Sequence, residues 1–208
     1  MSYIYVLPAI FDRLNSQMEK VFLESVIKQF KYYKMLGDKT FDQLNADDLF
    51  WKYNSESNSI ATIVKHLSSN MLSRWTDFLT TDGEKEWRNR EEEFENTINS
   101  KQDLLSIWRK GLNCLFETLK SLKEEDLEKE IFIRNQGHIV VEAINRQLAH
   151  YTYHVGQIVF IGKLLKDEKW KSLSIPRGES KKYNEEKFSK PKHKEHFTEA
   201  ILNDNKEV

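Results

Sequence analysis

Residues 147–157 read QLAHYTYHVGQ and place two histidines, His150 and His154, four positions apart. Apolar side chains recur around them at helical spacing, at Ile144, Leu148, Tyr151, Val155 and Val159. This spacing predicts an amphipathic helix over about residues 141–165. Because residues at i and i+4 share one helix face, the two imidazoles can converge on one ion. At about 100° per residue, both histidines lie beside the apolar stripe, at the border of the core.

Three more helices are expected before this one. Apolar periodicity predicts them over about residues 15–36, 58–79 and 102–122. A continuation of the first helix past Gly37 to Leu44 stays open. Asn58 or Ser59 would cap the start of the second helix, since both side chains accept a hydrogen bond from the first helical turn.

A short β-hairpin is expected before the last helix, because Ile131, Ile133, Ile139 and Val141 flank the turn pair Gln136-Gly137. The charged segment 80–103 is long enough to be a lid or a binding loop. The predicted fold class is all-α: a four-helix bundle with a short β-hairpin before the last long helix and a polar C-terminal extension. We expect one domain over residues 1–180 and a polar, mobile tail over residues 181–208.

The composition limits the functional classes. The chain has 208 residues, of which 39% are hydrophobic, so it can bury a core without disulfides. Lys plus Arg number 32 and Asp plus Glu 33, a balance that argues against nucleic-acid partners and against binding to an anionic membrane surface. Residues 1–10 do not read as a secretory signal. Cys114, the single cysteine, forms no internal disulfide, so a cytoplasmic location is expected.

The second predicted helix carries a third histidine of the same kind. His66 lies beside an apolar stripe formed by Ile60, Val64, Leu67, Met71 and Phe78. Border positions on two helices can meet at a groove or at an open end of a bundle, within reach of solvent. From spacing alone an alternative stays open, in which His66 bonds to a neighbouring side chain and the other two histidines only cover surface.

Two segments resemble the DinB/YfiT-like superfamily of four-helix metalloproteins. One is NSIATIVKHL at residues 58–67, followed by Asn70-Met71 and Arg74-Trp75, and the other is QLAHYTYHVGQI at residues 147–158. In that family one histidine of the second helix and an HxxxH pair of the last helix bind the metal. His66, His150 and His154 match this pattern, and the resemblance covers about residues 10–166.

A local resemblance to uncharacterised bacterial members of the group extends past the last helix. It includes Trp170, residues 174–178 and Tyr183-Asn184. The family contains thiol S-transferases that act with bacillithiol or mycothiol, a maleylpyruvate isomerase relative and members of no known activity. The resemblance therefore implies a divalent-metal-dependent enzyme that joins a low-molecular-weight thiol to a small electrophile. Relatives are often dimers, which implies a homodimer by analogy only.

Other functions stay open beside thiol transfer. One is a metal-dependent hydrolase of a small ester or amide, and another is a non-catalytic metal- or ligand-binding protein of a stress response. A zincin metalloprotease is disfavoured, because Tyr151 stands where the HExxH motif has its glutamate. Three neutral imidazoles leave at least one coordination position open, as in catalytic zinc sites. Zn²⁺ is the first expectation for the ion and Ni²⁺ the second.

Asn70, Gln147 and Gln157 are the candidates to orient an imidazole or a bound water, since each lies about one helical turn from a histidine. Ordinary hydrogen bonds between helices are the alternative for all three.

Trp87, Arg88 and Arg90 are candidate contacts for an anionic substrate, because they combine an aromatic ring and two cations in the charged segment. The alternative is that Trp87 only anchors that segment on the helices. Cys114 is expected to be a small, buried side chain and not a nucleophile. No catalytic residue can be assigned from the sequence.

Overall fold

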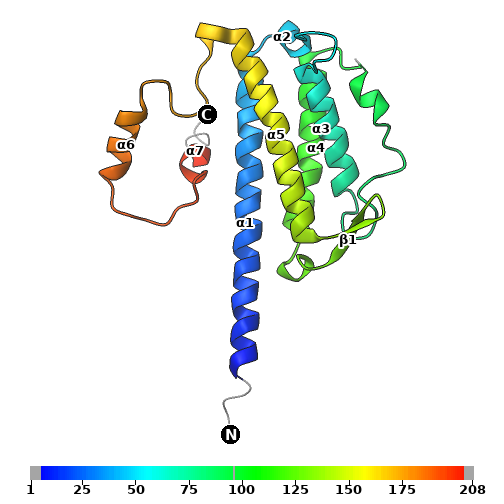
Figure 1. Cartoon of the computed structure of the whole chain (residues 1–208), viewed down its shortest axis with the longest axis vertical. Helices are drawn as coiled ribbons and strands as arrows, with labels where there is room; N and C mark the ends of the chain where they lie inside the picture. Colours follow the sequence, from blue (N-terminus) through cyan, green and yellow to red (C-terminus); the bar gives the residue numbers. More distant parts are fainter. Residues whose placement is uncertain (1–5, 96, 204–208) are drawn as a thin grey trace.

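The computed structural model describes residues 6–95 and 97–203, with side chains from residue 17 onward. The fold is mostly helical with one small antiparallel hairpin (Figure 1). The elements in chain order are α1 (Val6–Gln43), α2 (Ala46–Phe50), α3 (Ile60–Trp75), η1 (Glu91–Phe94), α4 (Lys101–Ser121), η2 (Glu124–Asp126), β1 (Glu130–Ile133), β2 (Gln136–Ile139), α5 (Val140–Lys166), η3 (Asp167–Lys169), α6 (Ser180–Phe188) and α7 (Glu199–Asn203).

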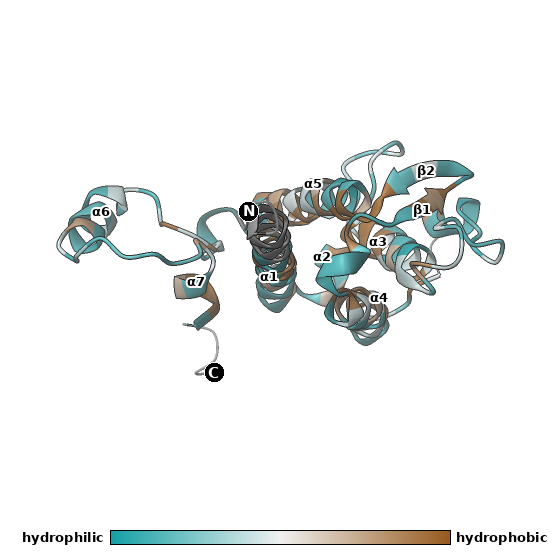
Figure 2. Ribbon diagram, turned by 90° about the horizontal axis from the view of Figure 1, so that it is seen from below, coloured by the Kyte–Doolittle hydropathy of each residue, from teal (hydrophilic) through white to brown (hydrophobic). Residues whose placement is uncertain are grey.

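The long helices α1, α3, α4 and α5 lie side by side and enclose the core. Helix α1 packs along α5, and α3 packs along α4 (Figures 1 and 2). Large side chains that are almost fully buried fill the space between them, among them Trp75, Trp108, Phe41, Leu67, Met71, Leu104, Leu115 and Ile144. Among the described helices, none is both long and apolar enough to cross a membrane.

The starts of α3, α4 and α5 follow the sequence prediction to within two residues. The Ser59 side chain accepts the backbone N–H of Thr62 at 3.1 Å and caps α3. Helix α3 ends at Trp75, a few residues before the predicted end, because the chain turns there and Asp77 adopts a positive φ of 47°. The start and end of α5 agree with the prediction to within two residues, and the hairpin is confirmed. Its turn, however, is Arg134-Asn135, whereas Gln136 and Gly137 lie in β2 and Val141 already belongs to α5.

Helix α1 is longer than predicted at its start, and it runs through Gly37. A Cβ atom at Gly37 would lie 2.9 Å from Cζ2 of Trp108 on α4. The missing side chain therefore lets the indole pack directly on the backbone of α1. Trp108 Nε1 also donates to Asp38 Oδ1 at 2.8 Å, so one residue both packs on α1 and hydrogen-bonds to it.

The hairpin is tied to the loop between α3 and α4. Arg134 and Asn135 form its turn with φ values of 55° and 59°, and their backbone N–H groups donate to the two oxygens of Asp82 at 2.8 Å each. The Gly83 N–H donates to the Phe132 carbonyl at 2.8 Å. The loop is thereby held beside the hairpin, and together they form a wall next to α3.

The predicted C-terminal tail contains α6 and α7 within its described part. Figure 1 shows α6 away from the long helices and α7 closer to α1. Lys28 of α1 pairs with Glu199 at 2.5 Å, and Ser25 bonds to His196 at 3.1 Å. Thr198 beside them is buried. The predicted division of the chain at residue 180 and the predicted mobility stay predictions.

The close approach of α3 and α4 gives a stability prediction with a matched control. A Cβ atom at Gly111 would lie 2.8 Å from the Ser68 Cα, whereas nothing lies within 4 Å of one at Gly156. Alanine raises helix propensity at both sites, so Gly156→Ala should stabilise the protein by about 0.5–1 kcal/mol. Gly111→Ala should be less stable than Gly156→Ala by about 1–3 kcal/mol through overpacking. Urea unfolding measures both, and equal stabilities would contradict the close approach.

Candidate metal centre

The three predicted histidines come together between α3 and α5. One ring nitrogen each of His66, His150 and His154 lies within 4.8 Å of the others. The Nε2 atoms of His66 and His150 are 3.3 Å apart. All three side chains are half-buried, as expected for border positions on two neighbouring helices.

Tyr151 fixes the position of α5 against α3. It is buried, and its hydroxyl donates to Asn70 Oδ1 at 3.0 Å while it accepts from Trp75 Nε1 at 3.0 Å. Asn70 lies one turn after His66 on α3. Asn70 makes the hydrogen bond between helices that was the alternative to orienting an imidazole, and its side chain also lines the cavity beside the histidines.

His66 is oriented by a buried carboxylate from η1. Glu93, whose side chain is 2% exposed, accepts from His66 Nδ1 at 2.7 Å. Arg88 donates to the same carboxylate through Nε at 2.7 Å and through Nη2 at 3.2 Å. Burial alone would raise the pKa of Glu93, but the bonds to His66 and Arg88 lower it to about 2. With the proton of His66 on Nδ1, its Nε2 lone pair faces the other two histidines.

On α5, His154 is also oriented by a hydrogen bond to its Nδ1 atom. His154 Nδ1 donates to Gln157 Oε1 at 2.8 Å, which leaves Nε2 free to face the cluster. Burial and the neighbouring His154 and His66 lower the pKa of His150 to about 3, and burial also lowers that of His154. The lowered pKa values of His150 and His154 favour their neutral form, which is the form that binds metals.

This donor set fits a divalent metal ion. Bonds of 2.0–2.1 Å in a tetrahedral site hold two nitrogens roughly 3.3 Å apart. The Nε2 atoms of His66 and His150 already have this separation. Metal-binding histidines commonly donate their second ring N–H to a carboxylate or an amide oxygen, as His66 and His154 do here.

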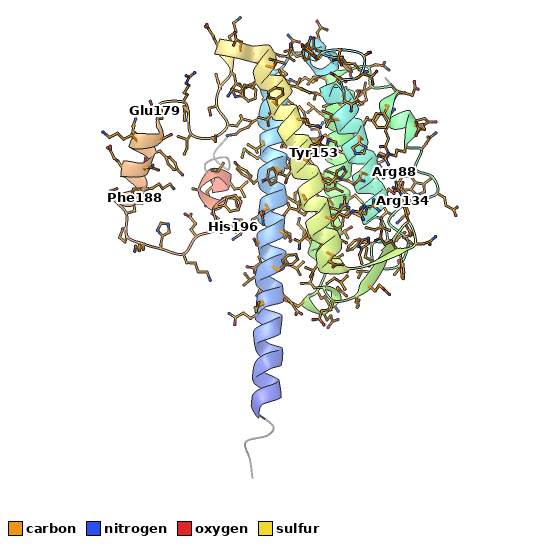
Figure 3. The ribbon with its side chains drawn as sticks, viewed as in Figure 1. Arg88, Arg134, Tyr153, Glu179, Phe188 and His196 are labelled. Atoms are coloured by element: carbon orange, nitrogen blue, oxygen red, sulfur yellow. The ribbon has the colours of Figure 1, made fainter. Side chains whose placement is uncertain are left out.

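The histidines open into a cavity of about 400 Å³. Its walls include five arginines: Arg74, Arg88, Arg90, Arg134 and Arg146. Figure 3 shows Arg88 and Arg134 on the same side of the molecule, beside α3. Tyr153, labelled on α5, is 63% exposed and plays no part in the cavity walls.

Of the other site residues predicted from the sequence, some line the cavity and some do not. Gln147 is buried and lines the cavity. Arg88 and Arg90 line the cavity as well. The guanidinium group of Arg88 is bound by the carboxylates of Glu84 and Glu93. Trp87 is 59% exposed and is absent from the cavity walls.

Cys114 is half-buried, and burial raises the pKa of its thiol, which keeps it protonated and unreactive at neutral pH. This placement agrees with a small structural side chain and offers no nucleophile to the cavity, whose walls do not include Cys114.

Glu93 was not among the site residues predicted from the sequence. The only local signal was the acidic run of residues 91–93, of which Glu93 alone is buried. Lys65 of α3 donates to the backbone carbonyls of Glu92 and Glu95 and holds η1 against the helix. A pattern based on helix period cannot find a residue that a loop supplies.

The buried pair of Arg88 and Glu93 gives a second stability prediction. Arg88→Met leaves the Glu93 carboxylate buried without its arginine, so the unfolding free energy should fall by about 3–5 kcal/mol. Arg109→Met on the exposed side of α4 is the control and should change it by no more than about 0.5 kcal/mol. Urea unfolding at pH 7 measures both. An Arg88→Met protein as stable as the control would show that this pair does not hold the loop.

Comparison with known families gives one match. A family model described as "Protein of unknown function (DUF1572)" matches residues 17–179, a span that contains all three histidines. No curated protein and no solved structure matches the chain.

Proposed function

The chain belongs to the DUF1572 family of proteins of unknown function, and we propose that it is a divalent-metal-dependent enzyme of the DinB/YfiT-like type. The observation that carries the proposal is the three-histidine cluster with outer partners on His66 and His154. In this proposal α1, α3, α4 and α5 are the four helices of the bundle. The order of the ligands along the chain supports it, with one histidine on the second long helix and a pair on the last.

Zn²⁺ is the proposed ion and Ni²⁺ the second candidate, because imidazole nitrogen suits both. When bound, such an ion would act as a Lewis acid that lowers the pKa of a thiol or a water molecule, or polarises a carbonyl group. The protein supplies the rest of the site: Glu93 and Gln157 hold two imidazoles in the ligand tautomer, and the arginine-lined cavity gives a small molecule access.

We propose thiol transfer as the reaction. The sulfur of a low-molecular-weight thiol forms a new S–C bond with an electrophile. The bond to the leaving group breaks with its electron pair on that group, and the thiol proton passes to solvent. This chemistry suits the cavity because no Asp or Glu lies among its described wall residues to act as a general base, and the nearby Glu84 and Glu93 are held in ion pairs.

Metal content tests the first part of the proposal. We expect the purified protein, stripped with a chelator, reloaded with Zn²⁺ and desalted, to retain one ion per chain in elemental analysis. The triple variant His66→Ala/His150→Ala/His154→Ala should retain none, because the ligands are gone. The matched control is His138→Ala/His193→Ala/His196→Ala, which removes three histidines outside the cluster and should bind as the wild type does. Equal retention by both triple variants would rule out the site.

Turnover tests the second part. Zn²⁺-loaded protein is incubated with bacillithiol and a chlorinated aromatic acceptor, and chloride release is followed. We expect release that depends on the metal and falls to background in the variant without the three histidines. In a parallel assay the acceptor is replaced by a small ester. Cleavage of this ester without thiol transfer would identify a hydrolase instead. Absence of metal-dependent turnover with either substrate, in protein that holds its ion, would contradict an enzymatic role of these kinds.

A further inference from the structure

One arginine in the cavity wall lacks the partners that its burial requires. The Arg74 side chain, near the end of α3, is 5% exposed. Its Nε and Nη1 atoms are buried and have no hydrogen-bond partner. Burying a charged donor without a partner is strongly unfavourable. No group in the described parts of the chain accepts a hydrogen bond from these two atoms.

The nearest carboxylate does not supply the missing bonds. Glu84 Oε2 lies 3.8 Å from Arg74 Nη2, beyond hydrogen-bond distance. The same oxygen lies 3.2 Å from Arg88 Nη1 and 3.2 Å from Arg134 Nη2, which bind it more closely. Glu84 is thus shared by three guanidinium groups, Glu93 binds Arg88, and Asp82 acts on Arg74 only through space, because its two oxygens accept from the hairpin turn. The five arginines of the cavity wall outnumber these three carboxylates, so the positive charge is in excess.

The rest of the cavity wall also carries more positive than negative charge. Arg90 and Arg146 line it as well, and neither forms an ion pair with a carboxylate in the part of the chain that the structure describes. Gln147 lines it too, and its buried Oε1 has no partner. Among the described wall residues there is no Asp or Glu. Unpartnered polar atoms and uncompensated positive charge therefore coincide in one cavity.

We propose that Arg74 binds an oxyanion group, a carboxylate or a phosphate, of a small molecule in this cavity. A guanidinium group suits both kinds of oxyanion, and charge-assisted hydrogen bonds to it are strong. A cavity of about 400 Å³ has the size of a small-molecule site. Where the proposed function also holds, this molecule is the electrophile or the thiol, with its reacting group at the histidines.

Arg74→Met is the decisive variant. It keeps most of the apolar stem and removes the guanidinium, whose Nη1 atom and the neighbouring Cδ atom lie against Gly83, while Glu84 keeps Arg88 and Arg134 as partners. Because buried, unpartnered donors are removed, the ligand-free variant should melt at or above the wild-type temperature. An arginine with a purely structural role would behave in the opposite way.

The experiment uses metal-free protein, so that it does not depend on the histidine site. Malonate and inorganic phosphate are titrated by calorimetry and thermal denaturation, with malonamide as the neutral control. One of the two anions, and not malonamide, should raise the wild-type Tm by roughly 5–10 °C at a hundredfold excess over its Kd. Arg74→Met should bind that anion at least about tenfold more weakly. Arg109→Met, with its change on the surface of α4, should bind as the wild type does.

Three results would overturn the inference. One is that neither anion binds to the wild type. This result is expected if ordered water molecules accept the hydrogen bonds of Arg74. Another is equal affinity of the wild type and Arg74→Met. The third is a large loss of Tm in ligand-free Arg74→Met and also in Arg74→Gln, which would show a structural role. Zn²⁺ retention by Arg74→Met is measured separately, so that failure of the anion site and failure of the metal site are distinguished.

Discussion

The site depends on the hydrogen-bonded contact in which Tyr151 lies between Trp75 and Asn70. Tyr151 belongs to the same helical segment as His150 and His154, and its two partners follow His66 on α3. Burial raises the pKa of Tyr151, so the side chain stays a neutral hydroxyl that can donate and accept at once. A shift of α5 along α3 would break both bonds and separate the imidazoles. Packing alone tolerates small shifts better than two directed hydrogen bonds do.

A second constraint comes from the chain between α3 and α4. Asp82 binds the hairpin turn, Lys65 holds η1, and Glu93 reaches His66. Through these contacts the charged segment between α3 and α4 forms one wall of the cavity. The arginines of that wall repel one another unless carboxylates intervene, and Glu84 and Glu93 neutralise only part of their charge. The same segment thus orients a histidine and supplies two of the five arginines of the cavity, whereas Arg74, Arg134 and Arg146 come from α3, the hairpin and α5.

The sequence predicted what depends on local periodicity. The positions of α3, α4 and α5, the Ser59 cap and the shared faces of the three histidines follow from apolar spacing and capping chemistry. The early start of α1 and the short helices α2, α6 and α7 were not predicted. Glu93 and Arg74 could not be recognised in this way. Glu93 acts from a loop, and Arg74 reads as an ordinary basic residue in the last turn of a helix. Its burial becomes evident only when the chain folds back, because Gly83 packs on its side chain.

The sequence distances across the histidine cluster have a further consequence for folding. His66 contacts Glu93 across 27 positions and His150 across 84. Contacts of such long range form after local helices, since the loop-closure entropy must first be overcome. The histidines therefore meet only once the two halves of the chain have docked. An ion held by all three would act as a reversible cross-link between those halves, and its release would precede or accompany their separation.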